Sequence, residues 1–127
     1  MKVNSKDNLA VKGYDVVAFF SGEASQGKSS ISQNHDGINY HFESVTNREK
    51  FVKDPAAFLP EYGGFCAIAM SEGAEADPNP KSFKIQDGNL YLFTRMFWGI
   101  VDVQRQWNKD PEGNRKLADV EWNKMTK

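Results

Sequence analysis

Tyr62-Gly63-Gly64-Phe65-Cys66-Ala67 is the stretch on which the predicted fold of this chain depends. Neither glycine carries a Cβ, so the backbone is able to turn sharply here and to approach another group closely. An apolar run, Ala67-Ile68-Ala69-Met70, follows and ends at Ser71. The sequence therefore predicts a tight turn that leads into a short buried segment. We expect a helix from Phe65 to Met70 in preference to a strand.

The length and composition of the chain predict a single soluble α+β domain over residues 1–127. A chain of 127 residues is large enough to bury roughly two-thirds of the surface that it exposes when unfolded. Aromatic residues make up 13% of it, which is sufficient for a packed core. The longest apolar runs, such as Val16-Val17-Ala18-Phe19-Phe20, are far shorter than the ~20 residues of a membrane-spanning helix. We therefore expect no membrane insertion.

The charges of the chain argue against nucleic acid as a partner. Sixteen basic and seventeen acidic residues give a net charge of −1, and both signs are scattered along the sequence. Because no basic stripe is present to neutralise a phosphate backbone, nucleic-acid binding is not expected. The segment Met1-Lys2-Val3-Asn4-Ser5 lacks the apolar run of a signal peptide. Two locations stay open, the cytoplasm or, after removal of a leader, an exported and periplasmic location.

Two turn signals predict two β-hairpins. Asp36-Gly37 is typical of a two-residue turn and predicts a hairpin over residues 30–44. The expected register pairs His35 with Ile38, Gln33 with Tyr40 and Ile31 with Phe42. Strand alternation then buries Ile31, Ile38, Tyr40 and Phe42 and turns His41 to the other face. Asp87-Gly88-Asn89 predicts the second hairpin, with strands 82–86 and 90–94.

Helical spacing is expected in four further segments. Ser44 or Thr46 begins the first helix, where Thr46 and Glu49 fit a capping box and Val45, Phe51 and Val52 supply the apolar face. Pro55 begins a short second helix that ends before Pro60. Residues 96–108 form a third, with Phe97, Ile100, Val101 and Trp107 on one side. Residues 114–124 form an amphipathic closing helix that buries Ala118, Trp122 and Met125, with Leu117 beside them. Two hairpins among short helices indicate an α+β domain with a small antiparallel sheet.

Cys66 is the residue most able to carry chemistry. It is the only cysteine, so no internal disulfide forms. If Phe65 begins a helix, the free N–H groups of the first turn favour a thiolate, which binds metals and attacks electrophiles. The alternative is a small apolar side chain packed in the core, which is the common state of an unpaired cysteine. The residues leave both interpretations open.

The metal hypothesis combines Cys66 with Met70 and His35. Met70 lies four residues after Cys66, so the two side chains share a face if the segment is helical. A thioether with a thiolate suits a soft ion such as Cu(I), and zinc is the other ion considered. The predicted hairpin places His35 on the inner side, from which it could reach Cys66. Such a lone histidine and a Cys–Met pair are also common in cores that bind no metal.

Several motifs, taken in order, resemble those of the long stand-alone YHS-domain proteins. Gly13-Tyr14-Asp15-Val16-Val17-Ala18-Phe19-Phe20 is similar to their GYDPVAYF opening, and residues 62–67 are similar to YGGYCA. Tyr40, His41 and Ser44 match the Tyr-His-Ser signature, and residues 87–92 match DGKLYL. The likeness runs from about residue 9 to residue 123. It implies a YHS-like fold. Shorter relatives are associated with metal binding and carry a CGM element and an FCS element. This chain has Gly-Tyr-Asp in place of the first element and Glu43 in the cysteine position of the second.

Three function hypotheses follow. The first is a small binding protein whose ligand contacts Cys66, Tyr62, Gly63 and Gly64, with copper or zinc as the ion considered. The second is a non-catalytic interaction or structural module in which Cys66 is buried, with an unidentified protein partner. The third, an enzyme with Cys66 as nucleophile, is disfavoured because the sequence places no base beside that residue. Trp98, Trp107 and Trp122 are interpreted as packing residues, although one of them could line an apolar pocket.

Overall fold

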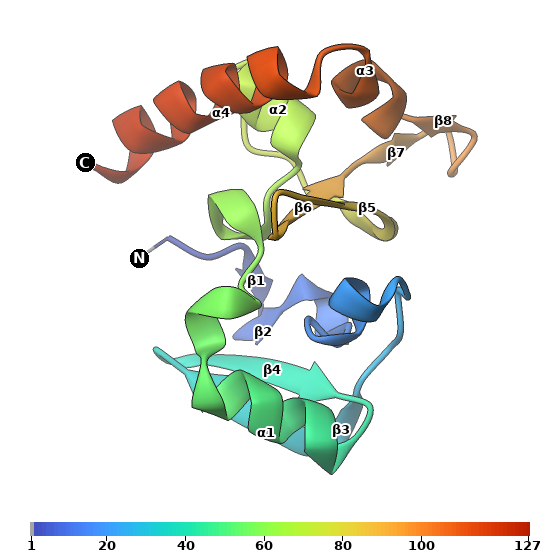
Figure 1. The fold of residues 1–127 in the computed structure, drawn as a ribbon, viewed down its shortest axis with the longest axis vertical. Coiled ribbons are helices and arrows are strands. Elements are labelled where there is room, and N and C mark those ends of the chain that lie inside the picture. Colours follow the sequence, from blue (N-terminus) through green and yellow to red (C-terminus); the bar gives the residue numbers. More distant parts are fainter. Residues whose placement is uncertain (1) are drawn as a thin grey trace.

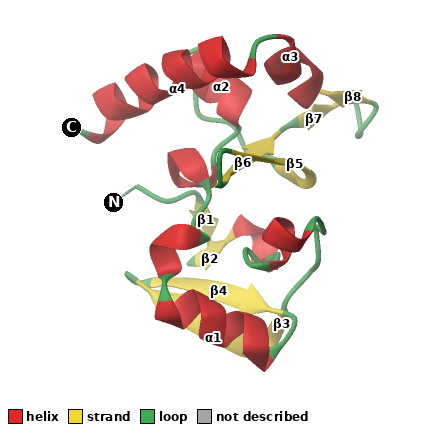
Figure 2. Ribbon diagram, in the orientation of Figure 1, coloured by secondary structure: helices red, strands yellow, loops and turns green. Residues whose placement is uncertain are grey.

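The computed structural model describes residues 2–127 and confirms the α+β class, with small antiparallel sheets and four α-helices (Figure 1). The chain forms two halves in sequence order. The first half holds β1 to β4 and α1, and the second holds α2, β5 to β8, α3 and α4 (Figure 2). The segment that contains the glycine pair lies between them.

The first half consists of β1 (Ser5–Lys6), β2 (Leu9–Ala10), β3 (Lys28–His35), β4 (Ile38–Phe42) and α1 (Val45–Lys53), with 3₁₀ turns at Val11–Gly13, Ala18–Ser21 and Pro55–Ala57. Its four strands form one sheet in the order β1-β2-β4-β3. The β2–β4 contact is parallel and the other two are antiparallel. The antiparallel pairing expected for the β3–β4 hairpin is confirmed, and one parallel pair between β2 and β4 makes the sheet mixed.

The second half follows the 3₁₀ turn at Glu61–Gly64 and consists of α2 (Ala67–Ser71), β5 (Asn79–Gln86), β6 (Asn89–Phe93), β7 (Arg95–Met96), β8 (Val101–Asp102), α3 (Gln104–Lys109) and α4 (Pro111–Thr126). β5 pairs with β6 and β7 pairs with β8, each antiparallel. The hairpin predicted around Asp87-Gly88-Asn89 is confirmed, and so is the closing helix, although α4 starts at Pro111.

Strand β6 separates two hydrophobic cores and contributes side chains to both. Leu90 and Leu92 pack in the first core with Phe19, Phe42 and Phe51. The alternate residues, Tyr91 and Phe93, pack in the second core, whose members also include Tyr62, Cys66, Met70, Trp107 and Ala118. Because successive side chains of a strand point to opposite faces, one strand covered on both sides serves two cores.

Asp15 is a fully buried carboxylate that joins three segments of the first half. Its Oδ1 accepts hydrogen bonds from the backbone N–H groups of Val17 (2.9 Å) and Ala18 (3.2 Å). Its Oδ2 accepts from the N–H of Glu43 (2.9 Å) and from the side-chain amide of Asn47 (2.9 Å). Four donors compensate for the loss of water around the charge. Asp15 thereby connects the segment before the 3₁₀ turn with the end of β4 and with α1.

The first hairpin follows the expected register only near its turn. His35 pairs with Ile38 and Gln33 pairs with Tyr40, as predicted. A bulge between Lys28 and Ser32 then shifts the strands, so that Phe42 pairs with Lys28 in place of Ile31. Tyr40 and Phe42 are buried, whereas Ile31 and Ile38 are only half-buried. The extra residues of a bulge are not visible in residue alternation, which is why the prediction fails beyond it.

Helix α1 begins directly after Ser44, the first of the two predicted start residues. Ser44 is its N-cap and accepts a hydrogen bond from the N–H of Asn47 (3.1 Å), so the Thr46–Glu49 box does not form. Phe51 is buried, but Val45 and Val52 are about half exposed, contrary to the predicted apolar face.

The predicted helix over residues 96–108 is wrong in its first half. Residues 95–102 form the hairpin of β7 and β8, and the helix, α3, starts at Gln104. Gly99 adopts a φ of 92°, and Phe97 and Trp98 also have positive φ, which a right-handed helix does not allow. Trp98 is exposed, whereas Trp107 is buried and Trp122 half-buried. The packing interpretation therefore fails for Trp98. Leu117, which was expected beside the buried residues of the closing helix, is exposed on α4.

Of the helices in the described part of the chain, none has the length and apolar character that crossing a membrane requires.

Substitution of Asp15 by Ala should reduce the free energy of unfolding by about 3 kcal/mol or more, because four donors lose a charged acceptor in a buried site. Urea denaturation followed by circular dichroism measures the change. The control is Asp87→Asn at an exposed turn with a φ of 52°, which Asn tolerates and which should change stability by less than about 0.5 kcal/mol. Equal effects of the two substitutions would contradict the role assigned to Asp15.

Candidate functional site

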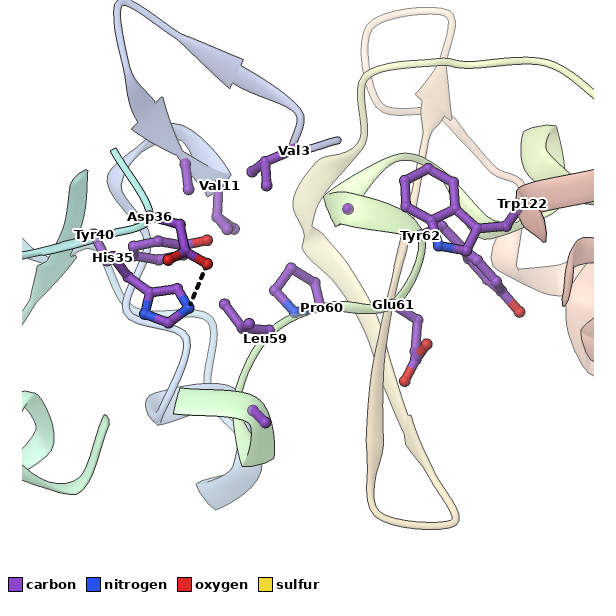
Figure 3. A pocket seen from close by; sticks show the side chains of 13 residues that line it. Val3, Val11, His35, Asp36, Tyr40, Leu59, Pro60, Glu61, Tyr62 and Trp122 are labelled. Atoms are coloured by element: carbon purple, nitrogen blue, oxygen red, sulfur yellow. Dashed lines mark ion pairs between the residues drawn. The ribbon is translucent and has the colours of Figure 1, made fainter. Parts of the chain in front are cut away.

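A cavity of about 350 Å³ lies where the glycine turn meets the first half (Figure 3). Its walls come from five parts of the chain: the N-terminal segment, the β3–β4 hairpin, the 3₁₀ turns after α1 and after Pro60, and α4. The lining residues are Val3, Ala10, Val11, His35, Asp36, Tyr40, Ala56, Leu59, Pro60, Glu61, Tyr62, Gly63 and Trp122. Most of these side chains are apolar or aromatic, and the few polar ones stand at the two sides.

The glycine turn forms the floor of the cavity through a close backbone contact. Tyr62 and Gly63 both have positive φ, 58° and 62°. The carbonyl of Gly63 accepts a hydrogen bond from the N–H of Asn4 (2.8 Å). A Cβ at Gly63 would overlap the carbonyl oxygen of Lys2 and touch the ring of Trp122. The close approach predicted for this glycine pair is thus confirmed at Gly63, whose neighbours are the N-terminal segment and α4.

The first polar side of the cavity belongs to the β3–β4 hairpin. His35 Nε2 lies 3.4 Å from Asp36 Oδ2 (Figure 3). The ring of Tyr40 packs against the rings of His35 and Phe51. Burial, with a smaller contribution from the charge of Asp36, raises the pKa of Tyr40 to about 12. Its hydroxyl therefore remains a hydrogen-bond donor at neutral pH.

The second polar side carries Glu61, next to Tyr62, whose hydroxyl points away from Leu59 and Pro60 (Figure 3). Burial raises the pKa of the Glu61 carboxyl, and the nearby charge of Asp119 raises it further. The hydroxyl of Tyr62 donates a hydrogen bond to Asp119 Oδ1 (2.9 Å). Burial and then this hydrogen bond raise the pKa of Tyr62, so its hydroxyl also stays protonated. Carboxylates outnumber cations around this side. Arg115 is the cation, and it is shared between Asp119 (3.0 Å) and Glu112.

Cys66 lies in the second core, away from this cavity. Its side chain is 1% exposed. The Sγ atom accepts a hydrogen bond from the N–H of Thr94 (3.3 Å), and its backbone forms a bridge to Leu92 of β6. Cys66 is the residue that precedes α2, a helix of five residues. The geometry agrees with the alternative in which this cysteine is a packed core residue.

The structure separates His35 from the other two residues of the metal hypothesis. Met70 is fully buried on α2 in the same core as Cys66, and its N–H donates to the Cys66 carbonyl (3.0 Å). His35 is at the end of β3, where its ring packs against Phe51 of the first core. Within residues 2–127 the structure brings together no group of three or more His, Cys, Asp or Glu side chains suited to a metal ion.

Of the residues proposed from the sequence, Tyr62, Gly63 and His35 line the cavity. Gly64, Cys66 and Met70 do not belong to its lining. Sequence reasoning missed most of the wall, including Asp36, Tyr40 and Glu61, and it indicated Trp122 only as one of three tryptophans that could line an apolar pocket. Two sequence features could have pointed to the carboxylates of this wall: Asp36 lies in a tight turn, and Glu61 lies close to the glycine pair. Neither position indicates by itself that the two carboxylates border one cavity.

Comparisons of the chain with protein-family models, with curated proteins and with solved structures find no match. The resemblance to YHS-domain proteins therefore stays a prediction.

The Glu61→Gln substitution should raise the free energy of unfolding at neutral pH. A carboxyl whose pKa is raised by folding favours the native state while it is protonated, and this contribution is lost as the pH rises through the folded pKa. The variant should therefore match the original protein below pH 4.5, the ordinary value for the group, and exceed it above. Urea denaturation across the pH range measures the difference.

The matched control is Glu112→Gln on α4. Hydrogen bonding to Arg115 lowers the pKa of Glu112, so neutralising this group should reduce stability at neutral pH. The two substitutions remove the same charge and are expected to act with opposite sign. The same sign for both would contradict the assigned environment of Glu61.

The Cys66 thiol should react with a disulfide-exchange reagent at least about a hundredfold more slowly in the native protein than in guanidinium chloride, because the sulfur is reached only after local opening. A Ser29→Cys substitution in a Cys66→Ser background supplies an exposed thiol for reference. Rapid native labelling of Cys66 that Cu(I) blocks would contradict the core assignment and favour the metal hypothesis.

Proposed function

We propose that this chain is a small non-catalytic binding protein that holds a mainly apolar small molecule in the cavity at the glycine turn. The observation that supports the proposal is the cavity itself, about 350 Å³ in volume, with a mostly apolar wall and few polar groups. Binding sites for small molecules have this size and character. Tyr62 and Gly63, two of the residues that the sequence indicated, contribute to its wall.

The charges of the wall favour a ligand with a cationic or hydrogen-bond-donating group. Asp36 stands on one side and Glu61 on the other, and none of the thirteen lining residues is Lys or Arg. The faces of Tyr40, Tyr62 and Trp122 offer further attraction for an organic cation. An anionic ligand would meet two carboxylates without a fixed positive partner. We therefore propose an amphipathic amine or alcohol as the ligand class.

The soft-metal proposal at Cys66 has narrower support. In its favour, Cys66 and Met70 lie in one core and on one short segment. Against it, the sulfur of Cys66 already accepts the hydrogen bond from Thr94, and His35 is in the other core. The same burial supports the proposal that Cys66 has no nucleophilic role.

We also propose that the chain is a distant YHS-like protein. The motifs that carry this resemblance contain residues that connect or pack separate parts of the fold. Asp15 of the opening motif is the buried carboxylate with four donors. The glycine turn lies at the junction of the halves, and residues 90–92 belong to the strand shared by the two cores.

A matched series of naphthalene compounds tests the proposed ligand class. 1-Naphthylmethylamine, 1-naphthylmethanol and 1-naphthoate share an apolar ring and differ in charge. Calorimetric titration should give the tightest binding for the amine, weaker binding for the alcohol and the weakest for the carboxylate. Asp36→Asn should weaken amine binding by about tenfold and leave alcohol binding nearly unchanged, because only the amine gains from the carboxylate charge.

Two neighbouring alanines provide the control for location. Ala56 and Ala57 are both exposed on one 3₁₀ turn, and only Ala56 lines the cavity. Ala56→Phe should therefore reduce binding of the amine by obstructing the cavity, whereas Ala57→Phe should not. Undiminished binding in both variants, with both folded by circular dichroism, would place the ligand elsewhere and overturn the proposal.

A further inference from the structure

The tip of the β7–β8 hairpin is an exposed apolar segment, which we call the tip and define as residues 96–101 (Met-Phe-Trp-Gly-Ile-Val). Trp98 is 98% exposed, Ile100 81% and Phe97 64%. Met96 and Val101, which pair across the hairpin, are 47% and 41% exposed. Trp98 and Ile100 thus lie exposed on the same turn. Contiguous exposed apolar patches on proteins generally mark contact sites.

The backbone of the tip is strained in a way that packing does not explain. Phe97 and Trp98 have φ of 54° and 56°. Bulky aromatic residues rarely adopt this conformation, and Asn or Gly would occupy it at lower cost. Since both side chains are largely exposed, the folded chain gains little contact in return. A conformation that costs free energy and presents two aromatic rings to the outside is consistent with a contact made beyond this chain.

The tip carries no charge on any side. Its six residues are all exposed, most fully at Trp98 and Ile100, whereas Met96 and Val101 are more than half covered by this chain. The interfacial layer of a bilayer has no fixed shape and accepts a protrusion from all sides, and tryptophan side chains favour that layer.

Positive charges gather beside the base of the hairpin. Arg95 and Asp102 form the ion pair that closes the apolar stretch (3.4 Å). Arg95 Nη2 also donates to the carbonyl of Lys81 (3.4 Å), and both side chains border a hollow that Lys12 lines as well. Asp77 is the acidic residue of that hollow. In a chain of net charge −1, this local excess of cations complements the phosphates of lipid headgroups.

We propose that the tip docks this protein onto a lipid bilayer, with Phe97, Trp98 and Ile100 in the interfacial layer and Lys81 and Arg95 at the phosphates. Beyond the Arg95–Asp102 pair each strand continues for only one residue, roughly 3 Å, and the turn of residues 97–100 with its side chains follows. A protrusion of this size suits the shallow layer, ~5–10 Å deep, that surface-bound segments enter. The expectation of no membrane insertion rested on the length of apolar runs for a spanning helix, and a hairpin tip needs no such run.

Vesicle flotation with the intact chain tests the proposal. The protein should float with vesicles of phosphatidylcholine and phosphatidylglycerol and less with phosphatidylcholine alone. A variant with Phe97→Ser, Trp98→Ser and Ile100→Ser should partition at least about tenfold less. The matched control, Leu117→Ser with Val120→Ser, removes exposed apolar side chains from α4 and should float as the original does. Lys81→Gln should weaken binding only to the anionic vesicles.

Tryptophan fluorescence gives a second readout that does not depend on the folding of the triple variant. Of the three tryptophans, Trp107 is buried, Trp122 is half-buried and Trp98 is exposed. Vesicles should shift the emission to the blue, and brominated lipids should quench it. Trp98→Phe should remove the shift and the quenching while flotation persists.

Absence of flotation by the intact protein on both kinds of vesicle would overturn the proposal. So would equal flotation of the triple variant and the original, which would place the lipid contact elsewhere. A dimer in light scattering that the triple variant abolishes, without any vesicle binding, would also overturn it and would assign the tip to a second copy of this chain.

Discussion

The structure depends on one strand that is buried on both faces. The four residues from Leu90 to Phe93 are all buried, and they alternate between the two cores. Burial of each such side chain contributes about 2 kcal/mol. Their sum is comparable with the whole net stability of an ordinary domain, roughly 5–15 kcal/mol. Neither half could keep its core without the strand, because each half supplies the cover for only one of its faces.

The position of the cavity follows from this arrangement. The chain must cross from one side of β6 to the other, and it does so through residues 60–66, which bridge to β6 at Pro60 and at Cys66. The glycine turn lies inside this crossing and leaves room beside Leu59 and Tyr62. The same crossing carries Cys66 into the second core, where Thr94 satisfies its sulfur. Tyr62 of the turn packs in the same core as Cys66, but only Tyr62 also lines the cavity.

Local signals in the sequence predict local structure well. Both Asp-Gly turns, the strands that flank them and the closing helix are correct, because positive φ and residue alternation are encoded within a few residues. Two kinds of feature could not be found in that way. One is the bulge before Ser32, which interrupts the strand alternation of the apolar residues. The other is the hairpin around Trp98, where the apolar residues have helical spacing. The cavity, meanwhile, is assembled from five distant segments, of which only Tyr62, Gly63 and His35 were indicated.

A protein with two cores commonly opens one part while the other stays folded. Here that route is costly, since detaching either half would leave a row of hydrocarbon on β6 facing water. We therefore expect the two halves to unfold together in spite of the two-part layout. The tip of the β7–β8 hairpin lies outside this coupling, because residues 96–101 are exposed and belong to neither core. Substitutions in the tip would therefore leave the packing behind it in place.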